Sequence, residues 1–174
     1  MYFSDCQNVE LAGLNILVPF LNKFSTVPPQ SITDEHQQKT IGDLMCHFKN
    51  LGETSVEVKI ESRFTGNLFI ETWSNREWGT PGWLHTCQAD LLVYYFLDED
   101  RLVTCGMSAL RHWCIGKADP HIDQYPVKQV KQNQRNDTVG TIVPICDLRD
   151  AKLDHWYECR PKQVLSQGDT NEPD

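Results

Sequence analysis

The segment TSVEVKI, residues 54–60, alternates apolar with polar side chains at every second position. Val56, Val58 and Ile60 form one set, and the residues between them form the other. Successive side chains of a β-strand point to opposite faces, so this period of two predicts a half-buried strand. Glu57 and Lys59 then point in the same direction.

A second strand is predicted just upstream. Thr40 to Phe48 follows the polar run Gln30 to Lys39, and Asn50-Leu51-Gly52-Glu53 has the composition of a turn. The two strands would form a hairpin. We therefore expect Asp43, on the first strand, to lie close to Glu57 on the second.

The rest of the chain adds helices and further strands. Apolar spacing predicts a helix from Asn8 to Phe24, which Pro19 weakens or kinks. A helix is expected to start near Thr86 and to carry an apolar stripe as far as Phe96. Ser108 is a candidate N-cap for a short helix that ends at Cys114.

Three more segments complete the prediction. Asn67 to Thr72 and Arg101 to Gly106 are predicted strands, and Thr141 to Ile145 is a candidate edge strand. Gly116 to Thr138 has little periodicity and is expected to be an irregular excursion. This order of elements predicts an α/β fold with a central mixed β-sheet flanked by helices. We expect one domain over residues 1–165 and a disordered polar tail over 166–174.

Composition limits the classes of function. The chain has 174 residues and a formal net charge of −8, which argues against a broad phosphate-binding surface. No apolar run approaches the roughly 20 residues that a membrane-spanning helix needs, and no signal peptide is visible at the start. We expect a soluble, cytoplasmic protein that does not enter a membrane.

The cysteines predict neither a disulfide framework nor a standard zinc site. The seven cysteines form an odd set without a C-x-x-C pair. Three spacings place a histidine near a cysteine, and a zinc site could be assembled from them: His85-x-Cys87, His112-x-Cys114 and His155-x-x-x-Cys159. Buried, reduced thiols are the favoured interpretation, because cysteine is among the most buried residue types.

Two regions could contact a nucleic acid. The stretch from Arg111 to Arg135 holds five basic residues against two acids, and an ordinary solvated surface explains it equally well. Trp73, Trp78 and Trp83 crowd a loop beside the predicted strands. They could stack on unpaired bases, although core packing is the more frequent role of such residues.

The hairpin also suggests a metal site. The carboxylates of Asp43 and Glu57, with the backbone carbonyl of Val58, would supply hard oxygen ligands that suit Mg²⁺ or Mn²⁺. Lys59 could then orient a water molecule or stabilise developing negative charge. A Glu-x-Lys tripeptide on a strand is a weak signal by itself, because charged residues alternate with valine on any exposed sheet face.

Four motifs occur together in a characteristic order. They are Ile41-Gly42-Asp43-Leu44, Val56-Glu57-Val58-Lys59, Thr65-Gly66-Asn67-Leu68-Phe69-Ile70-Glu71 and Gln88-Ala89-Asp90. In this order the chain resembles phage-type and Holliday-junction-resolvase-like members of the PD-(D/E)xK nuclease superfamily, over roughly residues 40 to 110. The resemblance implies a restriction-endonuclease-like fold and an Mg²⁺-dependent (or Mn²⁺-dependent) deoxyribonuclease that binds DNA.

The resemblance also assigns roles to residues. Asp43 and Glu57 match the metal-binding acids, and Lys59 matches the catalytic lysine. Gly42 stands where the family name has proline, a position that contributes no ligand. Glu71 resembles an extra acid near the metal, and Glu10 resembles a helical acid of resolvase-like members. An exposed strand position and a solvated helix position explain these last two residues equally well.

Further expectations follow from the resemblance. Resolvase-like relatives work in pairs, which implies a homodimer, and a phage-encoded protein would act in the host cytoplasm. A nuclease-like fold that no longer cuts and serves as a binding or inhibitory protein is the alternative, favoured by the acidic net charge. A zinc-stabilised interaction protein is a third possibility.

Overall fold

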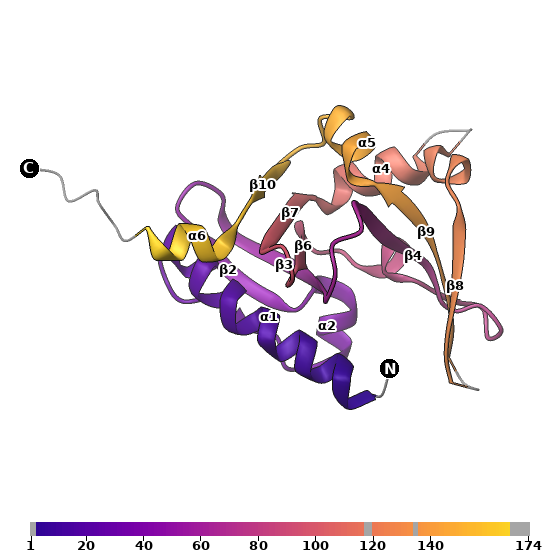
Figure 1. Cartoon of the computed structure of the whole chain (residues 1–174), viewed down its shortest axis with the longest axis horizontal. Helices are drawn as coiled ribbons and strands as arrows, with labels where there is room; N and C mark the ends of the chain where they lie inside the picture. Colours follow the sequence, from indigo (N-terminus) through magenta and orange to yellow (C-terminus); the bar gives the residue numbers. More distant parts are fainter. Residues whose placement is uncertain (1–2, 117–119, 134–135, 168–174) are drawn as a thin grey trace, which may run out of the picture.

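The computed structural model describes residues 3–116, 120–133 and 136–167. It is a mixed α/β structure in which helices flank a mixed sheet (Figure 1). The elements, in chain order, are α1 (Phe3–Phe24), β1 (Gln30–Ser31), α2 (Glu35–Ile41), β2 (Leu44–Phe48), β3 (Gly52–Glu61), β4 (Asn67–Asn75), β5 (Thr80–Pro81), α3 (Trp83–Thr86), β6 (Leu91–Phe96), β7 (Arg101–Gly106), α4 (Met107–Ile115), the 3₁₀ helix η1 (His121–Gln124), β8 (Val127–Asn133), β9 (Asn136–Pro144), α5 (Ile145–Asp150), β10 (Tyr157–Cys159) and α6 (Pro161–Ser166).

The strands form two sheets. Sheet A has the order β1-β2-β3-β6-β7-β10, and sheet B has the order β5-β4-β9-β8. Within sheet A, β3 and β6 run parallel, and the other neighbours are antiparallel. The expected mixed central sheet is therefore present.

Sheet A separates two hydrophobic cores. Leu17, Phe20 and Leu21 of α1 pack with Val56 and Tyr95 on one face. On the other face, side chains of sheet B and of α3, α4 and α5 surround Leu92, Tyr94 and Phe96 of β6. Figure 1 shows this order, with α1 on one side of the molecule and β4, β8 and β9 on the other.

Several predicted elements are confirmed. The first helix contains Pro19 and extends from residue 3, and β3, β4 and β7 cover the predicted strands. The short helix α4 forms as well, but its N-cap is Gly106 and not Ser108. Ser108 therefore lies inside the first turn.

The prediction of a helix from Thr86 is wrong. Residues 91–96 form strand β6. The helix near Thr86 is the four-residue α3, which ends at Thr86 instead of starting there. All six residues of β6 are buried. A strand covered on both faces is apolar throughout, so its periodicity does not separate it from a buried helix.

Two other predictions are also wrong. Residues 127–133 form β8, which lies inside the expected irregular excursion. Residues 141–144 belong to β9, which lies between β4 and β8 and is not an edge strand. Polar side chains in sheet B obscure the alternation of apolar and polar residues that would reveal its strands.

The greater part of the predicted tail, residues 168–174, lies outside the described residues.

No helix within the described part of the chain combines the length and apolar character needed to cross a membrane.

Candidate active site

Asp43 lies one residue before β2, so its predicted place within a strand is wrong. The segment 35–41 is helix α2, and Gly42 ends that helix with φ of 105° and ψ of −172°. This backbone region is essentially restricted to glycine. A Cβ atom on Gly42 would lie 2.7 Å from the carbonyl oxygen of Val56. Glycine thus permits the close approach that brings Asp43 against β3.

Two hydrogen bonds join Asp43 to β3. Its backbone N–H donates to the carbonyl oxygen of Val56 at 2.9 Å. Its Oδ2 accepts from the backbone N–H of Val58 at 2.8 Å. Both the main chain and the carboxylate of Asp43 are therefore fixed by the strand that carries Glu57 and Lys59.

Glu57 and Lys59 point in the same direction, as the period of two predicts. The Lys59 ammonium donates a hydrogen bond to Oε1 of Glu57. Glu57 is only 5% exposed, and its Oε2 accepts from the thiol of Cys87 at 3.5 Å. A buried carboxylate is stable when it has such partners.

The backbone of β3 directs the Val58 carbonyl toward Asp43. The pairing of β3 with β2 ends at Val56, which lies opposite Leu44. The N–H and C=O of one strand residue point to the same side, and the N–H of Val58 points to Asp43. The carbonyl of Val58 therefore lies on the edge of β3 that faces Asp43, where it could serve as the third oxygen ligand.

The site raises the pKa of Asp43 to about 6. Burial is the largest cause, and the carboxylate of Glu57 raises the pKa further. The N–H of Val58 and the Lys59 ammonium lower it, and Glu10 adds a small increase. Asp43 thus lies in a partly desolvated cluster of acids whose mutual repulsion a cation would relieve.

Lys59 remains protonated at the centre of the cluster. Burial acts to lower its pKa, but the carboxylates of Glu57, Asp43 and Glu71 favour the ammonium form, and the net pKa is raised. The side chain of Lys59 is 32% exposed. The side chain of Lys59 is therefore partly accessible, and its ammonium group lies among acids.

Glu71 and Glu10 both belong to the same region. Burial raises the pKa of Glu71, the nearby Lys59 lowers it, and Oε1 of Glu71 accepts from the backbone N–H of Trp83 at 3.4 Å. Glu10 is exposed on α1 and lines a cavity of about 350 Å³ together with Asp43, Val58 and Lys59. Lys59 thus interacts electrostatically with Glu57, Asp43 and Glu71, and Asp43 does so with Glu10, whereas Glu57 and Glu71 do not line the cavity.

Cys87 and Gln38, near the site, were not assigned a role there from the sequence, whereas Trp83 was a candidate for stacking on unpaired bases. Cys87 contacts Glu57, the ring centroid of Trp83 lies 5.9 Å from the Lys59 ammonium, and Gln38 of α2 lines the cavity. The sequence singled out Cys87 only as half of a His-x-Cys pair. Nothing in its spacing indicates Glu57 as a partner, because 30 residues separate the two.

Among the residues that the structure describes, no three His, Cys, Asp or Glu side chains form a ready-made set of metal ligands. The pairs of histidine and cysteine that lie in the described residues therefore form no such set. Cys87 and Cys114 are buried free thiols. At the acidic cluster, Lys59 itself engages Glu57. The donor types still fit a hard cation, because Asp43 and Glu57 supply carboxylates and Val58 supplies a backbone carbonyl.

The basic stretch from residue 111 to residue 135 does not form one surface in the described chain. Arg111 points inward, and its guanidinium donates to the backbone carbonyls of Leu84, at 2.8 Å, and Cys87. Lys128 is exposed on β8. Lys117 and Arg135 lie outside the described residues.

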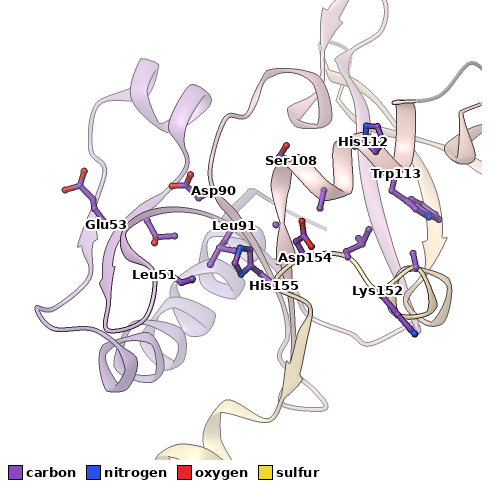
Figure 2. Close-up of a pocket in the computed structure, with 15 residues that line it drawn as sticks. Leu51, Glu53, Asp90, Leu91, Ser108, His112, Trp113, Lys152, Asp154 and His155 are labelled. Atoms are coloured by element: carbon purple, nitrogen blue, oxygen red, sulfur yellow. The ribbon is translucent and has the colours of Figure 1, made fainter.

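A larger cavity, of about 820 Å³, lies at the beginning of β3 (Figure 2). Asp90, Ser108, His112, Asp154 and His155 are among the residues that line it. Figure 2 shows these side chains spread around the cavity. The carboxylate of Asp90 already accepts hydrogen bonds from the backbone and the hydroxyl of Ser55, each at 2.8 Å. The cavity lacks the convergence of acids found at Asp43.

Comparisons of the chain with protein-family models, with curated proteins and with solved structures found no match.

Proposed function

We propose that the chain is a metal-dependent deoxyribonuclease of the PD-(D/E)xK type, with a restriction-endonuclease-like arrangement of its sheet. The observation that carries the proposal is the pair of hydrogen bonds that hold Asp43 against β3, beside Glu57 and Lys59. Acids from separate segments thereby lie near a lysine of the mixed sheet. Fold class alone would not support this function, since one fold serves many chemistries.

The chain's own residues would share the work of hydrolysis. Asp43, Glu57 and the Val58 carbonyl would hold Mg²⁺ or Mn²⁺, which supplies Lewis-acid polarisation of the phosphate and a more acidic bound water. Lys59 holds the Glu57 carboxylate and presents an ammonium to the phosphate oxygens, where negative charge develops. Glu10 and Glu71 surround the site and add negative charge that favours a divalent cation.

A nuclease-like protein that binds but does not cut is the second candidate. Two observations favour it: the net charge of −8 and the direct engagement of Glu57 by Lys59. In that case the lysine would replace a cation as the partner of the buried carboxylate. Dimerisation stays a prediction under either function.

Cleavage and metal binding can be measured together to test the proposal. Linear, nicked, flapped and four-way DNA substrates would be incubated with Mg²⁺ or Mn²⁺, and melting temperature would be recorded with and without each ion. We expect cleavage and a metal-induced rise in melting temperature, both lost in Asp43→Asn. Glu53→Gln, a change of an exposed acid at the start of β3, is the matched control and should behave as the unmodified protein.

The outcomes separate the candidates. Cleavage that survives in Asp43→Asn would point to a contaminating nuclease and reject the assignment. Absence of both cleavage and a metal-dependent melting shift in the unmodified protein would support the binding-only function.

A further inference from the structure

A hairpin of residues 71–83, called here the tryptophan arm, begins and ends at the candidate active site. At one end, the carboxyl of Glu71 interacts electrostatically with Lys59. At the other end, the backbone N–H of Trp83 donates to that carboxyl, and its ring lies 5.9 Å from the Lys59 ammonium. The base of the arm therefore forms one wall of the site.

The three tryptophans of the arm become more exposed with distance from the base. Trp83 is 9% exposed, Trp73 is 40% exposed, and Trp78, in the turn, is 69% exposed. Trp73 pairs with Pro81 halfway along the hairpin. The arm thus carries aromatic surface outward from the site.

The turn that presents Trp78 is fixed by hydrogen bonds. The backbone N–H of Trp78 donates to Oδ1 of the buried Asn75 at 3.1 Å. The N–H of Arg76 donates to the carbonyl of Asp137 at 2.9 Å, which joins the turn to β9. An exposed indole on a fixed turn loses little conformational entropy when it binds a partner.

The arm holds one basic residue, Arg76, against the acids Glu71 and Glu77, so it offers little for phosphate contacts. Arg76 and Glu77 stand next to each other in the turn, and the whole chain carries a net charge of −8. Tight duplex binding relies on many lysine and arginine contacts to phosphates. Aromatic side chains instead bind bases whose faces are free, as in single-stranded nucleic acid.

The length of the arm suits a DNA strand that enters the site. Asn75 lies four positions after Glu71, which corresponds to about 13 Å of strand. Stacked nucleotides are spaced by about 3.4 Å along a helix, so an arm of this length could span several of them.

Resting on the proposed nuclease function, we propose that the tryptophan arm stacks on unpaired bases, so that the substrate is DNA with a single-stranded segment adjoining the cleaved bond. Trp73 and Trp78 bind the unpaired strand, and Trp83 shapes the wall beside Lys59.

Binding can be measured without cleavage. Fluorescence anisotropy in the absence of divalent metal would compare a labelled 20-nucleotide oligothymidylate with a duplex of equal length. Trp78→Ala and Trp73→Ala are each expected to weaken binding of the single strand by about tenfold or more, while weak duplex binding stays unchanged. Tyr157→Ala is the control, because Tyr157 is 49% exposed on β10, at the far edge of sheet A.

Equal affinity for the single strand and the duplex would overturn the proposal. So would unchanged single-strand binding by both tryptophan variants, which would assign the exposed indoles to another partner. Circular dichroism of each variant confirms that the fold is retained, since both side chains lie largely outside the core.

The binding result and the cleavage result are independent. If no substrate is cut but single-strand binding still depends on Trp78, hydrolysis fails and the arm's role stands. If Asp43→Asn abolishes cleavage while Trp78→Ala leaves kcat/KM on single-stranded and flapped DNA unchanged, the nuclease function stands and the arm's role fails.

Discussion

Lys59 donates a hydrogen bond to Glu57 from two residues further along the same strand. The alternation of β3 brings the two side chains to one face, and burial makes Glu57 depend on a positively charged partner. The same ammonium is within electrostatic reach of Asp43 and Glu71. Lys59 therefore links the stability of the site to its chemistry.

We expect Lys59→Met to reduce cleavage by about 100-fold to 1,000-fold, since it removes the charge that stabilises the transition state. Loss of its hydrogen bond to the buried Glu57 should also lower the free energy of unfolding by about 1–3 kcal/mol. Single-turnover cleavage and urea denaturation measure the two effects. Lys162→Met, on the exposed surface of α6, should change neither.

The pKa of Asp43 predicts a dependence on pH. Because its pKa is about 6 in the folded chain and 3.8 without the surroundings, the folded state binds more protons between these values. The contribution of Asp43 to stability is therefore greatest below about pH 4, and it falls as the pH rises to about 6. Asp43→Asn should thus stabilise the protein more at pH 7 than at pH 4 in thermal melts. Equal effects at both pH values would contradict the raised pKa.

Metal binding should depend on the ionisation of the Asp43 carboxyl. A proton on Asp43 competes with a cation, so the affinity for Mn²⁺, measured by calorimetry in the unmodified protein, should rise as the pH increases through about 6. In Asp43→Asn this rise should disappear.

Two glycines with positive φ offer a matched test of the approach of Asp43 to β3. Gly42→Ala places a Cβ against the Val56 backbone, whereas a Cβ on Gly52, which has a φ of 75°, would meet nothing within 4 Å. Gly52→Ala should cost about 1–2 kcal/mol of conformational strain, and Gly42→Ala should cost more, because its backbone conformation is essentially restricted to glycine. Gly42→Ala should therefore lower the free energy of unfolding more than Gly52→Ala does. It alone should also lower cleavage activity. Comparable losses of stability and of activity in the two variants would show that the close contact of Gly42 with Val56 does not matter for the site.

Asp90 is expected to be structural, despite its place in the last motif of the family resemblance. Its carboxylate accepts from the backbone and hydroxyl of Ser55 and thereby joins the beginning of β6 to β3. Asp90→Ala should lower the free energy of unfolding by about 1–3 kcal/mol. Metal affinity measured well below the melting temperature should be retained. A selective loss of metal binding would place Asp90 in the site.

The sequence predicted strand β3 well because local alternation and the hydrophobic pattern agree there. It also predicted that Glu57 and Lys59 point in the same direction, since the period of a strand fixes which side chains share a face. It failed at β6, where burial on both faces removes that alternation. It failed again around Asp43, because helix α2 has no buried residue and so carries no apolar face to reveal it.

By itself, the sequence determined that residues 54–60 form a strand with a carboxylate and an ammonium on one face. It also supplied the acids that a hard cation would need. The sequence also led us to expect Asp43 near that strand, but only the tertiary structure decided that Asp43 reaches it from the end of α2, that Glu10 lines the same cavity, and that the tryptophan arm starts there. These relationships join segments far apart in the chain, and their closeness depends on the packing of α1 and sheet B around sheet A, which no local pattern encodes.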